Sequence, residues 1–191
     1  LFRSDPNLNI SQAISDELGF IKAVAVFGKG AQADDLSGLT DYSSSTDNSL
    51  ITNFFNSSTS TDLVAIGTTL LNHSTARFVY DLDVYKNSGG TSPVVVASIM
   101  REQHYQQSNN SPIQISFEYS NGLGQVVMKK VQAEPGLAKQ IVVQPDDTYT
   151  ITTVDTSASS PTQLRWIGNG RTVLNNKGNP VKKYEPYFSV S

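Results

Sequence analysis

The sequence contains no cysteine, no excess of positive charge and no long apolar run. Without cysteine there is no disulfide scaffold, no thiolate metal site and no cysteine nucleophile. Against 17 Asp and Glu there are only 14 Lys and Arg, which argues against binding to nucleic acid or to an anionic membrane. No segment approaches the ~20 consecutive apolar residues needed to cross a bilayer, so we expect no direct membrane insertion.

The chain is instead rich in small hydroxyl residues. Its 24 serines and 16 threonines make up 40 of the 191 residues, which is typical of exposed strands and loops. The hydrophobic share of 38% is enough for a core in a single domain of this length. The start of the chain lacks the signal-peptide pattern, and the sequence of residues 2–7 predicts a turn with no element before it. We therefore expect a fragment of a longer protein.

Alternating apolar and polar residues predict a mainly β fold. The clearest hairpin joins strands at 113–119 and 125–132 through an Asn-Gly pair, which tolerates the positive φ of a tight turn. A second pair is predicted at 76–85 and 93–105, with Asp81 and Asp83 on one face. Further strands are predicted at 23–27, 140–144, 148–154, 163–167 and 171–174.

Helices are expected only between residues 41 and 72. Apolar residues recur at helical spacing in 48–56 and in 61–71. Thr46 or Asp47 is the expected cap of the first helix and Thr61 that of the second, and Asn72 can end the second. We interpret 41–72 as a small helical insertion in a β framework.

Three short motifs place Asp or Asn three residues before a glycine. An Asx side chain can accept hydrogen bonds from backbone donors further along the turn, and glycine accepts the left-handed conformation that returns the chain. Each motif therefore predicts a strand, turn and strand unit, and repeated hairpins need neighbours to bury their faces. The structural turn residues are Asp16 with Gly19, Asn121 with Gly122 and Gly124, and Asn175 with Gly178.

At these motifs the sequence resembles the RHS/YD-repeat family, whose repeats carry Asp-x-x-Gly turns followed by strands. Four stretches in the family's order resemble the RHS portion of the B component of bacterial insecticidal toxin complexes, also called virulence plasmid protein B-like: residues 16–29, 76–83, 117–136 and 165–188. The run from Trp166 to Phe188 is the most specific of these matches, and the resemblance spans nearly the whole chain.

The resemblance implies that residues 1–191 form an RHS-repeat segment of a larger β-sheet shell. In that family the B component joins the C component in a hollow shell that encloses an unfolded cytotoxic effector before translocation through the A component. The implied partners are therefore the remainder of its own B component, the C component and the A component, in a secreted virulence toxin. The implied role is structural, without catalysis.

No residue set in the sequence predicts catalysis, a cofactor or a metal site. His73 and His104 are the only histidines, and no nucleophile or ligand trio accompanies either one. His73 is expected at the surface near a helix end, and Asp81 and Asp83 on a solvated strand face. The motifs of serine hydrolases, phosphate-binding loops and dinucleotide sites are missing. The aromatic residues mostly occupy strand positions, where cross-strand packing accounts for them.

Two other functions remain open from the sequence. The first is a cell-surface module of an RHS/YD-repeat adhesin that binds a carbohydrate or a protein through exposed aromatic residues. The second is an enzyme, which would require paired buried carboxylates among Asp81, Asp83, Glu102 and Glu118.

Overall fold

A computed structural model of the chain describes residues 2–4, 6, 9–28, 32–39, 49–57, 59–122, 124–157, 163–169 and 172–190. Within them the fold is mainly β, with thirteen strands and three helices. The strands are β1 (Phe2–Ser4), β2 (Ile10–Ser15), β3 (Ile21–Phe27), β4 (Ala76–Asp81), β5 (Val94–Arg101), β6 (Ile113–Ser120), β7 (Val126–Ala133), β8 (Leu137–Val143), β9 (Tyr149–Asp155), β10 (Arg165–Gly168), β11 (Thr172–Leu174), β12 (Pro180–Lys183) and β13 (Tyr187–Ser189). The helices are α1 (Ser49–Phe55), α2 (Ser60–Leu71) and α3 (Val84–Asn87), and none in the described part is long and apolar enough to cross a membrane.

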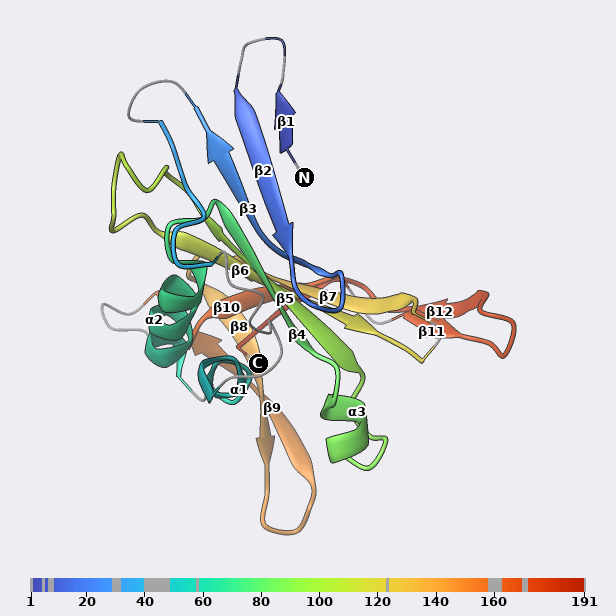
Figure 1. Cartoon of the computed structure of the whole chain (residues 1–191). Helices are drawn as coiled ribbons and strands as arrows, with labels where there is room; N and C mark the ends of the chain where they lie inside the picture. The colour runs from blue at the N-terminus through green and yellow to red at the C-terminus, as the bar shows by residue number, and fades with distance from the viewer. Residues whose placement is uncertain are drawn as a thin grey trace.

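Eleven strands form one large, mostly antiparallel sheet in the order β1-β2-β3-β4-β5-β6-β7-β10-β13-β8-β9. The first seven strands follow the order of the chain, because each one pairs with its predecessor. Beyond β7 the order changes, and β13 meets β8 in the one parallel pairing among the described strands, at Ser189 and Lys139. Strands β11 and β12 form a separate ribbon that points away to the right in Figure 1.

The main core lies between helices α1 and α2 and one face of the sheet (Figure 1). Phe54 of α1 is 1% exposed and its ring centroid lies 6.0 Å from that of Phe117 on β6. Burying a side chain of this size contributes about 1.5–3 kcal/mol. The other buried members are Ile51, Leu63, Leu70, Leu71, Val79, Ala97, Ile99, Ile113, Ile115 and Trp166. The apolar residues that alternate in the 113–119 stretch therefore point to the face of the sheet that the helices cover.

A smaller core covers the neighbouring part of the same sheet. Ala23 and Ala25 of β3 pack with Leu36 and Leu39, which belong to the segment after β3. Residues 32–39 therefore cover this part of the sheet with irregular backbone.

The helical region agrees with the predicted spacing, but the predicted cap of α2 is wrong. Thr59 is the N-cap residue, and its Oγ1 accepts a hydrogen bond of 3.1 Å from the backbone N–H of Asp62. Thr61 lies inside the first turn, where its backbone is already helical. Asn72 ends the helix with φ 50. The proposed caps of α1 at Thr46 and Asp47 lie outside the described residues.

The hairpin predicted at 76–85 and 93–105 forms with shorter strands. Pairing runs from Ala76–Met100 to Asp81–Val95 and stops where the chain leaves β4 and turns into α3. Residues 84–87 instead form α3, a helical turn outside the predicted insertion. Asp83 therefore lies beyond β4, at the N-cap of α3, so the prediction that Asp81 and Asp83 share one strand face is wrong.

Candidate interaction surfaces

Asp16 organises the turn between β2 and β3. Its Oδ1 accepts hydrogen bonds from the backbone N–H groups of Leu18 and Phe20, at 3.0 and 2.9 Å. The backbone N–H of Gly19 donates to the carbonyl of Asp16 at 3.1 Å, and Gly19 has φ 84. A single side-chain oxygen thereby satisfies two turn donors that no strand partner reaches.

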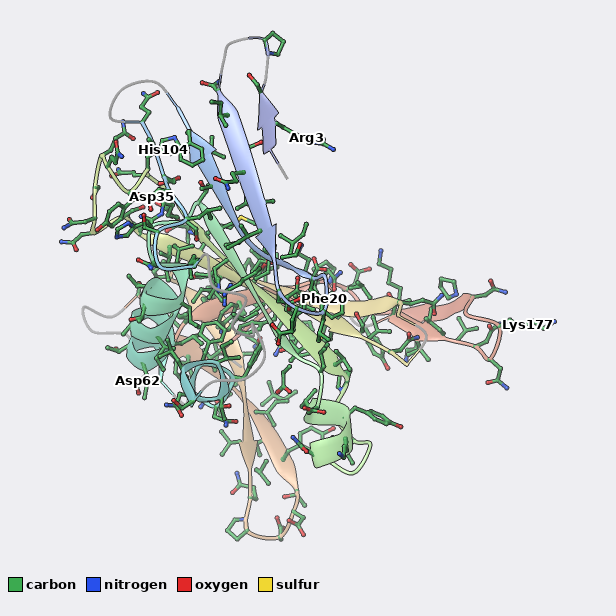
Figure 2. The ribbon with its side chains drawn as sticks, viewed as in Figure 1. Arg3, Phe20, Asp35, Asp62, His104 and Lys177 are labelled. Atoms are coloured by element: carbon green, nitrogen blue, oxygen red, sulfur yellow. The ribbon has the colours of Figure 1, made fainter. Side chains whose placement is uncertain are left out.

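Asn121 and Asn175 occupy the equivalent position in two further hairpin turns. The Oδ1 of Asn121 accepts from the N–H of Gln125 at 3.0 Å. That of Asn175 accepts from the N–H groups of Lys177 and Asn179, at 2.9 and 3.0 Å. In each turn the glycine three residues later has a positive φ, 74 at Gly124 and 77 at Gly178. The three hairpins thus share one turn geometry. Figure 2 shows Lys177 at the far tip of the β11–β12 ribbon.

A fourth turn of the same backbone form joins β8 to β9. The N–H of Gln144 donates the closing hydrogen bond to the carbonyl of Thr148 at 2.8 Å, and Asp147 takes the positive φ of 62. Asp146 accepts the hydrogen bond from the N–H of Thr148 in place of an Asx residue at position 144. This turn lacks the Asx-x-x-Gly pattern of the other three, because residue 144 is glutamine and residue 147 is aspartate.

The predicted role of the Asn-Gly pair at 121–122 is wrong in one respect. Neither residue has a positive φ, and Gly124 carries that conformation instead. The loop is longer than a two-residue hairpin turn, since the backbone N–H of Asn121 pairs with the carbonyl of Gln125.

Replacing Gly124 by alanine is expected to lower the free energy of unfolding by about 1–2 kcal/mol. The cause is backbone strain alone, because a Cβ at Gly124 meets nothing within 4 Å among the described residues. Gly122→Ala in the same turn is the matched control, and its effect should be neutral or stabilising by up to about 1 kcal/mol. Urea unfolding followed by the fluorescence of Trp166 measures both, and equal losses in the two variants would contradict the assignment.

Both histidines are found at one segment, residues 101–105: His104 belongs to it, and His73 contacts it. The Nδ1 of His104 lies 2.9 Å from Asp34 Oδ2, and the Nδ1 of His73 lies 3.1 Å from Asp35 Oδ1. His73 also stacks on Tyr105, with ring centroids 3.8 Å apart. Asp35 and His104 are labelled close together in Figure 2. The sequence did not predict that the two histidines would come together.

Asp34 is the centre of this group, and its side chain is fully buried. Its carboxylate accepts hydrogen bonds from the Thr75 hydroxyl at 2.6 Å and from the backbone N–H of Tyr105 at 2.6 Å. The Nε of Arg101, whose side chain is 5% exposed, lies 3.7 Å from the same carboxylate. We call Asp34, Thr75, Arg101, His104 and Tyr105 the Asp34 cluster. Its hydrogen bonds tie three separate chain segments together.

Two ionic groups in and beside the Asp34 cluster, Arg101 and Asp35, have shifted pKa values. Burial lowers the pKa of Arg101, and the neighbouring charge of Asp34 opposes that effect. Burial on its own raises the pKa of Asp35, but hydrogen bonds from Ser37 and the charge of His73 outweigh it, so the pKa lies below its ordinary value. In the described part of the chain no three His, Asp or Glu side chains are arranged to hold a metal ion.

The four carboxylates considered for catalysis lie in different elements. Glu118 on β6 forms an ion pair with Lys129 at 2.6 Å, and Glu102, which follows β5, accepts a hydrogen bond from Gln114. Asp81 ends β4 and Asp83 precedes α3. The contacts of Glu118 and Glu102 are with Lys129 and Gln114, and neither joins two of the four carboxylates.

The sheet is open at both ends. Strands β1 and β9 are the outermost strands, and no described strand pairs with their outer sides. Unpaired N–H and C=O groups along such edges can accept a further strand. The β8–β9 hairpin extends well away from the helices in Figure 1.

One face of the β8–β9 hairpin is apolar and exposed. Its cross-strand pairs are Ile141 with Ile151 and Val143 with Tyr149. These four residues and Leu137, which we call the apolar face, are each 61–68% exposed. Contiguous exposed apolar residues often form a surface that contacts another protein or another part of the same protein.

Comparison with known proteins gives structural matches only. No family model matches the sequence, and no curated protein matches it. A crystal structure of TcdB2-TccC3 matches the whole chain with a TM-score of 0.66 at 16% identity. Structures of TcdB2-TccC3 without its hypervariable C-terminal region and of TcdB2-TccC3-Cdc42 match the whole chain with TM-scores of 0.64 and 0.62, both at 14% identity.

These matches establish the fold of the chain. The chain spans only 8–10% of the length of the chains that it matches. Its mainly β fold, predicted from the sequence, is confirmed, and it is shared with a segment of the TcdB2-TccC3 structures.

Proposed function

We propose that this chain is a non-catalytic wall segment of a toxin-complex B component, which helps to enclose a cytotoxic effector before translocation. The observation that carries the proposal is the fold match to TcdB2-TccC3 over 100% of the chain. The sequence motifs support it independently, because the family-like stretches occur in order along the same residues.

The open ends of the sheet support the same proposal. A wall segment must continue into neighbouring segments, and β1 and β9 offer edges for added strands. The partners of the proposal are therefore the remainder of the B component at these edges, the C component that completes the shell and the A component. The proposed location is extracellular, as for a secreted toxin complex.

Electron microscopy of the complete gene product, prepared with its C component, tests the proposed function. We expect a hollow particle with this chain in its wall, and an effector segment that resists added protease until the particle is opened. A solid globular particle, or an effector that is digested at once, would contradict the proposal.

The isolated chain is expected to self-associate as its concentration rises, because its edges and apolar face lack their neighbours. Ile151→Asp should weaken association about tenfold or more. An isoleucine that becomes buried in the contact between two chains contributes about 1.5–3 kcal/mol, and the variant removes it. Thr150→Asp, on the opposite face of β9, is the matched control. Sedimentation velocity measures both variants, and a wild-type chain that stays monomeric at high concentration would show the prediction to be wrong.

A further inference from the structure

A pocket of about 850 Å³ lies where three hairpins meet. Tyr85 of α3 contributes to one side, Tyr119 and Met128 of β6 and β7 to another, and Leu174 of β11 to a third. Its volume is within the ~300–1,000 Å³ range of pockets that hold a small organic molecule. The pocket is separate from the apolar face and from the open edges.

The charged residues of this pocket are all positive. Lys86 and Lys130 line it, and no Asp or Glu is among the described residues that do. The chain as a whole carries a net charge of -3, so the local charge is opposite to the overall one. The remaining lining is largely apolar, and the pocket therefore favours an anion carried on an apolar body.

Lys130 reaches the pocket because of its place in the strand register. It pairs with Phe117 and shares the face of β7 that lies on the helix side of the sheet, whereas Lys129 points to the other face. The Nζ of Lys129 has a carboxylate partner, Glu118, at 2.6 Å. The Nζ of Lys130 forms no hydrogen bond or ion pair with the described residues, and lies 5.9 Å from the centroid of the Tyr119 ring.

The surroundings of Lys130 penalise its charge. The side chain is partly buried among apolar groups, and burial lowers the pKa of Lys130 below its ordinary value. A partly desolvated ammonium without a counter-ion is penalised, and an incoming carboxylate would offset that penalty. Burial in the same region also raises the pKa of Tyr119 above its ordinary value.

We propose that this pocket binds an amphipathic monocarboxylate of small-molecule size. The carboxylate pairs with the Nζ of Lys130, and the apolar body lies against Tyr85, Met128 and Leu174. This inference does not depend on the proposed wall function, because the pocket is formed entirely by residues of this chain.

Calorimetric titration of the whole chain with decanoate, decanol and acetate tests the proposal. Decanoate should bind at least about tenfold more tightly than either of the others, because it alone supplies both the charge and the apolar body. Equal affinity for decanoate and decanol, or no binding of decanoate, would overturn the proposal. A peptide with glutamate between two leucines is a further ligand, and tighter binding of this peptide than of decanoate would also overturn it.

Two lysine variants locate the binding site. Lys130→Met should weaken decanoate binding about tenfold or more and leave the weak binding of decanol unchanged. Lys177→Met, at the tip of the β11–β12 ribbon, removes an equal charge away from the pocket and should bind as the wild type does. Unchanged decanoate affinity in folded Lys130→Met would refute the site. In the wild type, NMR of the Lys130 side chain should show its pKa rising when decanoate binds, a readout that does not depend on how the variants fold.

Discussion

Replacing Asp34 by alanine is expected to lower the free energy of unfolding by about 3–5 kcal/mol. The variant leaves the buried guanidinium of Arg101 without its carboxylate, and it removes the acceptor of the Thr75 hydroxyl and of the Tyr105 N–H. Because the Thr75 hydroxyl also accepts a hydrogen bond from the N–H of Val26 at 2.8 Å, the loss extends to β3. Chemical denaturation measures the change.

Two further variants separate charge from shape at this position. Asp34→Asn keeps the volume and one acceptor oxygen but loses the charge, so it should fall between the wild type and Asp34→Ala. Asp35→Ala, in the adjacent and partly exposed His73 pair, should cost only about 1 kcal/mol. A similar loss for Asp34→Ala and Asp35→Ala would show that the Asp34 cluster contributes little.

Replacing Phe54 by alanine is expected to cost about 3–5 kcal/mol. The ring is 1% exposed, and its centroid lies 5.5 Å from that of Phe55 and 6.0 Å from that of Phe117. A cavity there loosens α1 from the sheet, because Ile51 and Phe54 are the buried residues of this helix. Thermal unfolding by circular dichroism gives the loss of stability.

The control for the core variant is Ile151→Ala on the apolar face. Ile151 is 61% exposed, so its truncation should change the stability of the chain by less than about 0.5 kcal/mol at low concentration. If Phe54→Ala costs no more than Ile151→Ala, the helices do not stabilise the sheet in the way that the contacts indicate.

Local patterns in the sequence predicted the hairpins well. Period-two alternation identified β6 and β7, and their antiparallel register confirms it. The alternation at 82–84 misled because it continues past Asp81, where pairing with β5 stops. Period-two patterns report which residues prefer a strand, but not whether a partner is present.

The residues that come together over long distances were not predictable in the same way. The Asp34 cluster joins residues from 34 to 105, and its only local signal is the consecutive pair Asp34 and Asp35. Lys129 and Lys130 form a basic pair in the sequence, yet the pleat places them on opposite faces with different surroundings. The pocket beside Lys130 depends on α3, which the sequence analysis did not predict.

The order of strands in the sheet also determines the order in which the chain can fold. Each of strands β2 to β7 pairs with the strand that precedes it in the chain, so these pairings can form as the chain leaves the ribosome. The β8–β9 hairpin differs, because its link to the sheet runs through β13, some fifty residues later than β8. Until residues 187–189 arrive, this hairpin and its apolar face have no place in the sheet. We therefore expect this region to join the sheet later than strands β1 to β7.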